Sequence, residues 1–495
     1  MAAVDEKPFP PGDYEVVVVG SGPGGLQTSY ELRSLGIRHA VLSADDTPGG
    51  MFQRFPVYER LITWTKPDAP FERGTREYEW FDHNSLLAEE PECRALVPGL
   101  MDRTFDVPSR EEMEAGLVEF AQRTRLKIRY GCRWESTRRE EDGFVLVTSD
   151  GEYRCRAAVF AIGVTEPWKA PIPGAEHAAH YVDTGDPEQY RGRSVFIVGK
   201  RNSGFEVASG LLAWAARIVL ASPRPVDTAQ IGRSPVRARY LQPLDEYARG
   251  GASAYVVDAT IERIERRDGG FRVVAHGTTW PGELFFEVDD VLIATGFRTP
   301  LRDLPALGLA TVSDGRIPAL TRYFESVTVP GVYFAGNASQ GYPGLRKQGL
   351  GANSGSVNGF RYNARILARH IAERRFGKRV ERPVLARDQV LQYLLHELAV
   401  APELWVQKGY LARVVSFGGE IRDEGIVPLE EFVDEPGPSA IAVAVEMNRE
   451  AEIHPAVYVR SSSRLIEAAL PAHPTRSFDS EQHRRELATL LELVG

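Results

Sequence analysis

The sequence predicts an α/β fold in which one βαβ unit is inserted into another and an α+β domain is appended. Two observations support this prediction. An apolar strand runs into a glycine-rich turn and an amphipathic helix near the N-terminus, and the same order recurs close to residue 199. After about Arg387 the alternation stops, and a helix, two apolar strands and a charged terminal helix follow. At 495 residues the chain is long enough for about three domains.

Composition and charge narrow the class of partner. The net charge is −9 and the basic residues are scattered, so we expect neither nucleic acid nor a membrane surface as a partner. No apolar run approaches the roughly 20 residues that cross a bilayer, and the N-terminus does not resemble a signal peptide, which favours the cytoplasm. The three cysteines form neither a Cys-x-x-Cys pair nor a metal-ligand set, so we expect no metal site and no redox dithiol. A small molecule is the expected partner.

The first βαβ unit carries a G-x-G-x-x-G turn. The elements around it are the strand Tyr14 to Val19, the helix Leu26 to Leu35 and the strand Ala40 to Leu42. Gly20 permits the tight turn, Gly22 lets a pyrophosphate approach the backbone, and Gly25 lets the helix pack on the strand. An acidic residue normally ends the second strand and binds the ribose, but Ser43 stands there, so we assign this role to Asp45. The unit is predicted to bind a dinucleotide.

The second βαβ unit departs from the pattern at one position. Its elements are the strand Ser194 to Val198, the turn Gly199 to Gly204, the helix Phe205 to Ala216 and the strand Ile218 to Ala221. Arg201 replaces the middle glycine, so its guanidinium either binds the phosphates or blocks the site and leaves a structural remnant. We favour binding, because the strand and helix are intact. The next strand runs into Ser222 and Arg224, and an arginine there suits the 2′-phosphate of NADPH.

Further motifs accompany the two turns. They are Ala161-Ile-Gly163, Ala294-Thr-Gly296, Val332-Tyr-Phe-Ala-Gly336-Asn337 and Asn202-Ser203-Gly204-x-Glu206-x-Ala208. With these motifs the chain resembles the two-dinucleotide-binding-domain flavoproteins of the pyridine nucleotide-disulphide oxidoreductase superfamily, and within them the flavin-containing monooxygenases. Two departures are Asn337, where the family has an aspartate, and Ala178, where the monooxygenase motif has a histidine.

The resemblance implies FAD on the first unit and NADPH on the second. The motifs and the resemblance together predict cofactor contacts from Gly20, Gly22, Gly24, Gly25, Ser43, Asp45, Gly49, Gly50, Met51, Gly163, Gly199, Arg201, Asn202, Ser203, Gly204, Ser222, Arg224, Thr295, Gly296, Gly336 and Asn337. The pattern along the chain and the resemblance, which covers about Tyr14 to Arg375, predict an FAD-binding domain at 1–165 and 286–380 and an NADPH-binding domain at 166–285. The resemblance does not reach the appended domain at 387–495, whose role stays open between a homodimer interface, a lid and partner docking.

The activity that this resemblance implies is monooxygenation. NADPH reduces FAD, the reduced flavin takes up O2, and the resulting flavin peroxide transfers one oxygen to an amine or thioether. The resemblance places the segment 341–353 near the flavin ring, and Arg346, Gln348 and Asn353 are its candidate catalytic donors. Two alternatives stay open. One is an oxidase or dehydrogenase that its own substrate reduces, with a degenerate nicotinamide site, and the other is a flavin electron-transfer or sensor protein.

Overall fold

The protein divides into two compact units. The computed structural model describes residues 7–226, 236–251, 253–344, 353–450, 452–461 and 464–494. The first unit consists of Met1–Gln53, Thr63–Val164 and Thr299–Gly495, and the second of Arg54–Ile62 and Thr165–Arg298. One unit is therefore inserted in the other, which confirms the predicted architecture.

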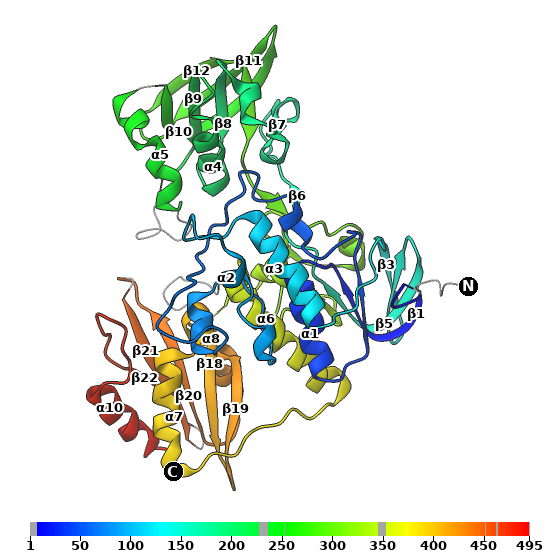
Figure 1. Cartoon of the computed structure of the whole chain (residues 1–495), viewed down its shortest axis with the longest axis vertical. Helices are drawn as coiled ribbons and strands as arrows, with labels where there is room; N and C mark the ends of the chain where they lie inside the picture. The colour runs from blue at the N-terminus through cyan, green and yellow to red at the C-terminus, as the bar shows by residue number, and fades with distance from the viewer. Residues whose placement is uncertain are drawn as a thin grey trace. The chain divides into compact units, whose positions relative to one another are not determined.

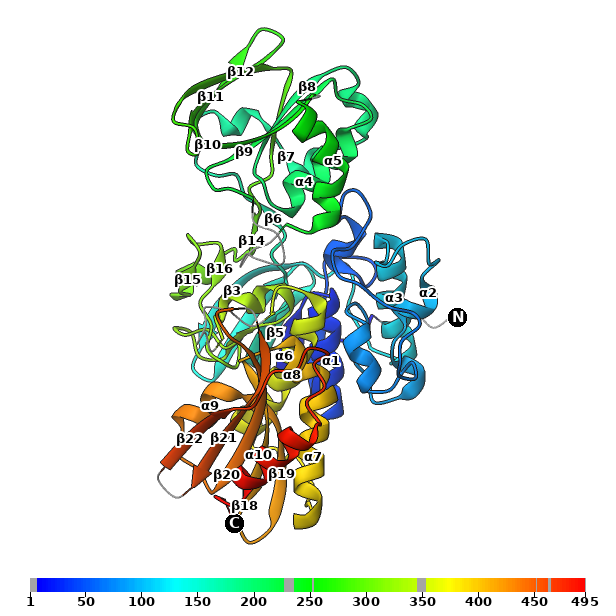
Figure 2. The same ribbon diagram turned by 90° about the vertical axis from the view of Figure 1, so that its left-hand side faces the viewer.

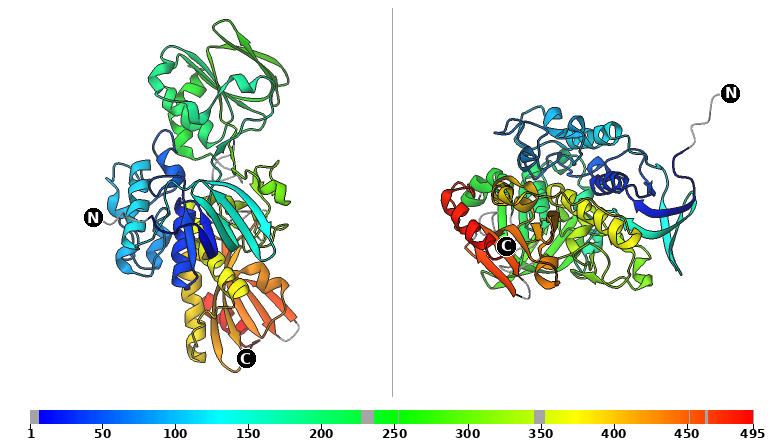
Figure 3. Two further views of the ribbon diagram at one scale, coloured as in Figure 1. Left: turned by 90° about the vertical axis from the view of Figure 1, so that its right-hand side faces the viewer. Right: turned by 90° about the horizontal axis from the view of Figure 1, so that it is seen from below.

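The first unit is built on a parallel sheet of β2 (His39–Leu42), β1 (Gly12–Val19), β5 (Gly151–Phe160) and β17 (Val332–Phe334). The apolar run of β1 is buried on both faces, as strands between helical layers are. The helices α1 (Pro23–Ser34) and α6 (Val357–His370) pack against each other beside this sheet (Figures 1 and 3).

Shorter elements complete this unit. An antiparallel pair, β3 (Trp134–Glu140) and β4 (Gly143–Thr148), extends the sheet from β5. The remaining elements are α2 (Val97–Leu100), α3 (Arg110–Arg123), β15 (Thr311–Val312) and β16 (Ile317–Pro318). None of the described helices is long and apolar enough to cross a bilayer.

The second unit repeats this plan. Its sheet has the order β12-β11-β10-β9-β8-β13-β7, and β10, β9, β8, β13 and β7 run parallel. The strands of this sheet are β7 (Ala179–His180), β8 (Ser194–Val198), β9 (Arg217–Ser222), β10 (Ala254–Arg267), β11 (Gly270–Gly277), β12 (Gly282–Val288) and β13 (Asp290–Ile293). A separate short pair consists of β6 (Glu166–Pro167) and β14 (Phe297–Arg298). The helices of the unit are α4 (Asn202–Leu211) and α5 (Ala238–Gly250).

Two boundaries differ from the sequence prediction. The segment 286–380 was assigned to the FAD-binding domain, but β13 pairs with β8 in the second sheet, so the second unit ends at Arg298. The predicted helix to Ala216 ends at Leu211, because the amides of Leu212 and Trp214 bond three residues back and tighten the last turn.

The C-terminal segment forms its own antiparallel sheet, in the order β19-β18-β20-β21-β22. Its elements are α7 (Arg387–Val400), α8 (Pro402–Val406), β18 (Leu411–Phe417), β19 (Ile421–Pro428), α9 (Leu429–Asp434), β20 (Ala440–Met447), β21 (Ile453–Ser461), β22 (Arg464–Ala469) and α10 (Glu481–Leu491). The helices α7 and α10 lie side by side against β20 and β21 (Figure 2). On α9, Leu429 and Phe432 pack onto alanines of the sheet, which leave room for them. The appended α+β domain is thus present.

Candidate functional site

The first glycine-rich loop is packed against backbone at three of its glycines. A Cβ on Gly20 would collide with the carbonyl oxygen of Ala161, and one on Gly25 with that of Gly20. A Cβ on Gly24 would lie 2.5 Å from the amide nitrogen of Gly336. These three glycines are therefore needed for the fold itself.

Gly22 is different, because the protein does not fill the space beside it. A Cβ there would meet nothing closer than Cα of Gly50, at 3.8 Å. Gly22 is also the N-cap of α1 with φ −71°, a conformation open to any residue. A pyrophosphate lying against this backbone and the free amides of the helix N-terminus would explain the missing side chain. The cradle therefore fits a dinucleotide such as FAD.

The structure brings three predicted segments together at this loop. Gly336, at the end of β17, lies against Gly24. The amide of Gly49 donates to the carbonyl of Ser21 at 3.1 Å, and Gly50, with φ +57°, lies against Gly22. Gly24 and Gly336 are 312 residues apart in the sequence, so only the fold brings these segments together. The role of each residue toward FAD remains a prediction.

The other predicted residues of the first unit have local partners. Ser43 is buried, its hydroxyl lies 2.7 Å from that of Ser21, and it accepts from the amide of Asp45. Asn337 Oδ1 accepts from Gln340 Nε2 at 2.7 Å. Met51 is half-buried in a short 3₁₀ turn, and Gly163 follows β5 with φ +69°. Ser43 therefore shapes the loop, while Asp45 stays the candidate for the ribose.

The second loop repeats the geometry of the first. A Cβ on Gly199 would collide with the carbonyl oxygen of Ala294, and one on Gly204 with that of Gly199. Arg201 is the N-cap of α4, the position that Gly22 holds on α1, and it is exposed. Beside it the Lys200 ammonium is buried in an ion pair with Asp258. The loop thus has the backbone packing of the first glycine-rich turn, and Arg201 places a guanidinium group at the N-cap, where the first loop has Gly22.

Several predicted nicotinamide-site residues support the loop from within. Asn202 Oδ1 accepts from the amide of Arg237 at 3.1 Å. Thr295 Oγ1 donates to the carbonyl of Trp168 at 2.8 Å, and the carbonyl of Gly296 accepts from His180 Nε2. Of the others, Ser203 and Ser222 are half-buried and Arg224 is exposed. Arg224 is therefore free to reach a ligand beyond β9.

Comparison with known proteins agrees with this geometry. The model of the pyridine nucleotide-disulphide oxidoreductase family matches residues 17–336. The chain belongs to this family. It is 25% identical to the FAD-dependent oxidoreductase domain-containing protein 2 of Danio rerio over 82% of the chain and 65% of that relative, so it spans just under two thirds of the relative's length. It is 32% identical to a ferredoxin–NADP reductase of Thermus thermophilus over 67% of the chain and 86% of that protein.

A solved structure shares the fold. The flavin-containing monooxygenase of Stenotrophomonas maltophilia has a TM-score of 0.55 and 22% identity, over 73% of this chain and 99% of that one. The relatives of this family include a FAD-dependent oxidoreductase domain-containing protein and a ferredoxin–NADP reductase, which agrees with FAD as the cofactor. The two-domain flavoprotein resemblance and the FAD assignment are confirmed.

In this flavoenzyme the appended domain fixes the start of α6. Gln407, which follows α8, is fully buried. Its Oε1 accepts from the amide of Asn353 at 2.6 Å, and its Nε2 donates to Asn363 Oδ1 at 2.6 Å and to the carbonyl of Gly359. Asn353 itself is exposed and bonds to Asn358. The candidates Arg346 and Gln348 lie outside the described residues.

An ion-pair network joins the appended domain to the FAD-binding region. Arg76 Nη1 lies 2.6 Å from Glu397 Oε1, and its Nη2 lies 2.9 Å from Glu403 Oε2. Arg413 Nε lies 2.8 Å from the other oxygen of Glu397. Both carboxylates are buried. Burial alone would raise the pKa of Glu397 and of Glu403, but the charges of Arg76 and Arg413 outweigh it, so that the pKa of each is lowered. The network holds α7 and α8 against the segment that carries Arg76.

A cluster of aromatic side chains lies beside the start of α6. The ring of Trp64 lies 3.9 Å from that of His83, and His83 Nδ1 lies 3.2 Å from Asn358 Nδ2. Trp80 contacts both of these rings, and on its other side Trp405 from α8 at 5.7 Å. Trp405, which comes from α8, is buried in this cluster, whereas Trp64 is 42% exposed.

Sequence reasoning missed His83, Gln407 and Arg76. His83 stands in a run of four polar residues, 82–85, which reads as an exposed loop, yet all four are buried. Arg361 on α6 holds this run, because its guanidinium donates to the carbonyls of Asp82 and Ser85 at 2.8 and 2.7 Å. No signal in the sequence pairs Arg361 with a loop almost 280 residues away.

A buried acid in the second unit gives a pH prediction. Glu206 on α4 accepts from the hydroxyl of Tyr181, and burial raises its pKa from 4.5 to about 7. The folded state therefore holds a proton that the unfolded state releases above about pH 5. The free energy of unfolding is therefore highest below pH 4.5, where Glu206 is protonated in both states, and it falls as pH rises toward the folded-state pKa of about 7. The total decrease is about 3 kcal/mol.

Replacing Glu206 with glutamine should remove this dependence. Denaturant unfolding of the wild type should show stability falling between about pH 5 and pH 8, and Glu206→Gln should flatten that slope. Glu283→Gln, at an exposed position on β12, is the matched control and should leave the slope unchanged. A Glu206→Gln profile with the wild-type slope would assign the pH dependence elsewhere.

Proposed function

We propose that the protein is an NADPH-dependent monooxygenase that transfers one oxygen atom of O2 to a small nucleophile, an amine or a thioether. The observation that carries this proposal is the cluster of aromatic rings of Trp64, Trp80, His83 and Trp405 at the start of α6. Oxygen transfer from a reduced flavin needs a site that excludes water, and the buried rings of His83 and Trp405 would contribute to one.

The cysteines favour oxygen over a dithiol as the electron acceptor. Cys93, Cys132 and Cys155 are the three cysteines of the chain, and all are buried and unbridged. Burial raises the pKa of each thiol, most strongly for Cys155 at about 12, which suppresses the reactive thiolate. Electron transfer from the flavin to a pair of cysteines would need two thiols close together, and these three cysteines provide no such pair.

NADPH is the proposed reductant. The second loop reproduces the packing of the first, and Arg201 and Arg224 are both exposed beside it. Two guanidinium groups suit a pyrophosphate and a 2′-phosphate. When bound, FAD supplies the redox chemistry by accepting a hydride from the reduced nicotinamide and passing its electrons to O2. The chain's own task is to hold the two cofactors and to exclude water.

Electron transfer to a protein is the second candidate. The identity of 32% to a ferredoxin–NADP reductase covers 86% of that protein. In that case the reduced flavin would pass electrons to a carrier rather than to oxygen. The appended domain would then take part in docking the carrier.

The test begins with anaerobic titration of the FAD-loaded protein with NADPH and separately with NADH. We expect NADPH to bleach the oxidised-flavin band, and Arg224→Ala to raise the NADPH concentration required about tenfold, with little effect on NADH. Failure of both nucleotides to bleach the flavin would point to an oxidase that its own substrate reduces. Equal effects on the two nucleotides would exclude Arg224 from the 2′-phosphate site.

A second step separates oxygenation from electron transfer. The NADPH-reduced protein is exposed to ¹⁸O2 in the presence of a panel of amines and thioethers. One labelled oxygen in a product supports the proposal. Complete conversion of O2 to hydrogen peroxide, together with rapid reduction of a ferredoxin, would replace it with the second candidate.

A further inference from the structure

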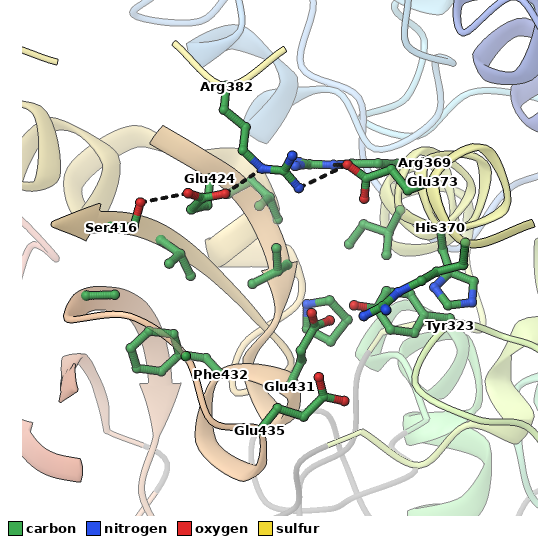
Figure 4. A pocket seen from close by; sticks show the side chains of 18 of the residues that line it. Tyr323, Arg369, His370, Glu373, Arg382, Ser416, Glu424, Glu431, Phe432 and Glu435 are labelled. Carbon is green, nitrogen blue, oxygen red and sulfur yellow. Dashed lines mark hydrogen bonds and ion pairs between the residues drawn. The ribbon is translucent and has the colours of Figure 1, made fainter. Parts of the chain in front are cut away.

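A pocket lies at the end of α6 that is opposite the aromatic cluster. Its volume is about 560 Å³, within the range of small-molecule sites, roughly 300–1,000 Å³. The walls come from α6 and the segment after it, from β18 and β19, and from α9 and β20 (Figure 4). Along α6 about 18 Å separate His370, which lines the pocket, from Asn358, so this is not the flavin region.

One end of the pocket is a closed polar wall. Arg382 lies between two carboxylates, at 3.0 Å from Glu373 Oε1 and 2.5 Å from Glu424 Oε2. The hydroxyl of Ser416 donates to Glu424 at 2.7 Å, and Arg369 lies 3.6 Å from Glu373 (Figure 4). The charges of these groups are paired with one another, although Arg382 Nε makes no hydrogen bond within the described residues, so this wall mainly shapes the pocket.

The opposite end carries an acceptor that the described residues leave unsatisfied. Glu431 Oε2 is buried and accepts no hydrogen bond from any residue in the described ranges. Its neighbour Glu435 extends to the same side of the pocket and pairs with Arg322 (Figure 4). Burial and the charge of Glu435 raise the pKa of Glu431, and the charges of Arg322 and Arg460 offset this only in part. A cationic donor would relieve both effects, because a buried acceptor without a partner is costly.

The walls between the two ends are mostly apolar, although the guanidinium of Arg460 also lines the pocket, 4.2 Å from the centre of the Phe432 ring. The rings of Tyr323 and His370 stack at 3.9 Å with 15° between their planes. Burial lowers the pKa of His370 to about 4, so the imidazole is neutral at pH 7. The aliphatic and aromatic side chains that complete this surface are Ile366, Val414, Ile426, Val427 and Phe432. This part suits an apolar body.

The rim of the pocket is basic. Arg374, Lys378 and Arg379 line it and are exposed. Among the residues that the structure describes, no carboxylate lies within ion-pair distance of Arg374 or Arg379. The rim therefore favours an anionic group at one end of a ligand whose other end is cationic.

We propose that this pocket binds a small zwitterion with an apolar body, of the size of a dipeptide. Its ammonium group donates to Glu431, its apolar part lies against the stacked Tyr323 and His370, and its carboxylate faces Arg374 and Arg379. The inference is independent of the reaction at the flavin.

Isothermal titration of the FAD-loaded full-length protein with leucyl-phenylalanine tests this site. We expect saturable binding at millimolar concentration or below, and an affinity at least about tenfold weaker for the N-acetylated and for the C-amidated dipeptide. Glu431→Gln should weaken binding of the free dipeptide by a similar factor and leave the N-acetylated one unaffected. Unchanged flavin absorbance in the variant shows that it is folded.

Matched variants complete the test. Glu420→Gln changes an exposed carboxylate in the turn between β18 and β19, outside the pocket, and should bind like the wild type. Arg374→Ser combined with Arg379→Ser should remove the difference between the free and the amidated dipeptide. Absence of binding by leucyl-phenylalanine, or equal affinity for its free and acetylated forms, would overturn the proposal.

Discussion

Gly22→Leu should yield a folded protein that purifies without FAD. A leucine at this N-cap meets no protein atom closer than the 3.8 Å to Gly50 at its Cβ, so the fold tolerates it. The side chain instead occupies the space beside the backbone where the pyrophosphate must lie. We expect FAD affinity to fall at least about 100-fold, or about 2.8 kcal/mol, measured from the flavin content and by reconstitution with added FAD.

Gly419→Leu is the control for this substitution. Gly419 also has open space around it, but it lies in the turn between β18 and β19 of the appended domain. It should retain full flavin content. A Gly22→Leu protein that purifies fully flavinated would remove the first loop from the cofactor site, whereas a protein that fails to fold would show that the loop tolerates no side chain there.

Arg76→Met should destabilise the protein by about 3–5 kcal/mol, because it leaves buried carboxylates without their cation. Arg413 still pairs with Glu397, but the hydrogen bonds of Arg76 to Glu403 are lost. Burial of these acids then becomes a net cost. Denaturant unfolding followed by circular dichroism measures the change, and we expect the appended domain to unfold at lower denaturant concentration than in the wild type.

The exposed pair of Arg138 and Glu152 provides the comparison. Their separation is 2.9 Å, similar to that in the buried network, but both side chains are more than 40% exposed. Arg138→Met should leave the unfolding midpoint almost unchanged, because solvent screens exposed ion pairs. Equal effects of the two substitutions would show that the Arg76 network contributes nothing beyond a surface contact.

Correct and incorrect predictions from the sequence differ in whether the signal is local. Gly20, Gly22 and Gly25 were assigned correctly to a strand–turn–helix because that pattern is complete within a few consecutive residues. The β13 boundary was misplaced because the apolar run before Gly296 carries the same local pattern whichever sheet it joins. Only hydrogen-bond pairing distinguishes the two.

The sequence by itself determined the two glycine-rich strand–turn–helix loops, the insertion of one unit in the other and the α+β character of the C-terminal segment. These follow from hydrophobic periodicity and from glycines at fixed spacing, which are local properties. The tertiary structure alone decided that Gly24 packs on Gly336, that Gln407 fixes α6 and that Glu431 faces a pocket. Those contacts join residues far apart in the chain, or depend on burial, and burial is set by the packing of whole elements.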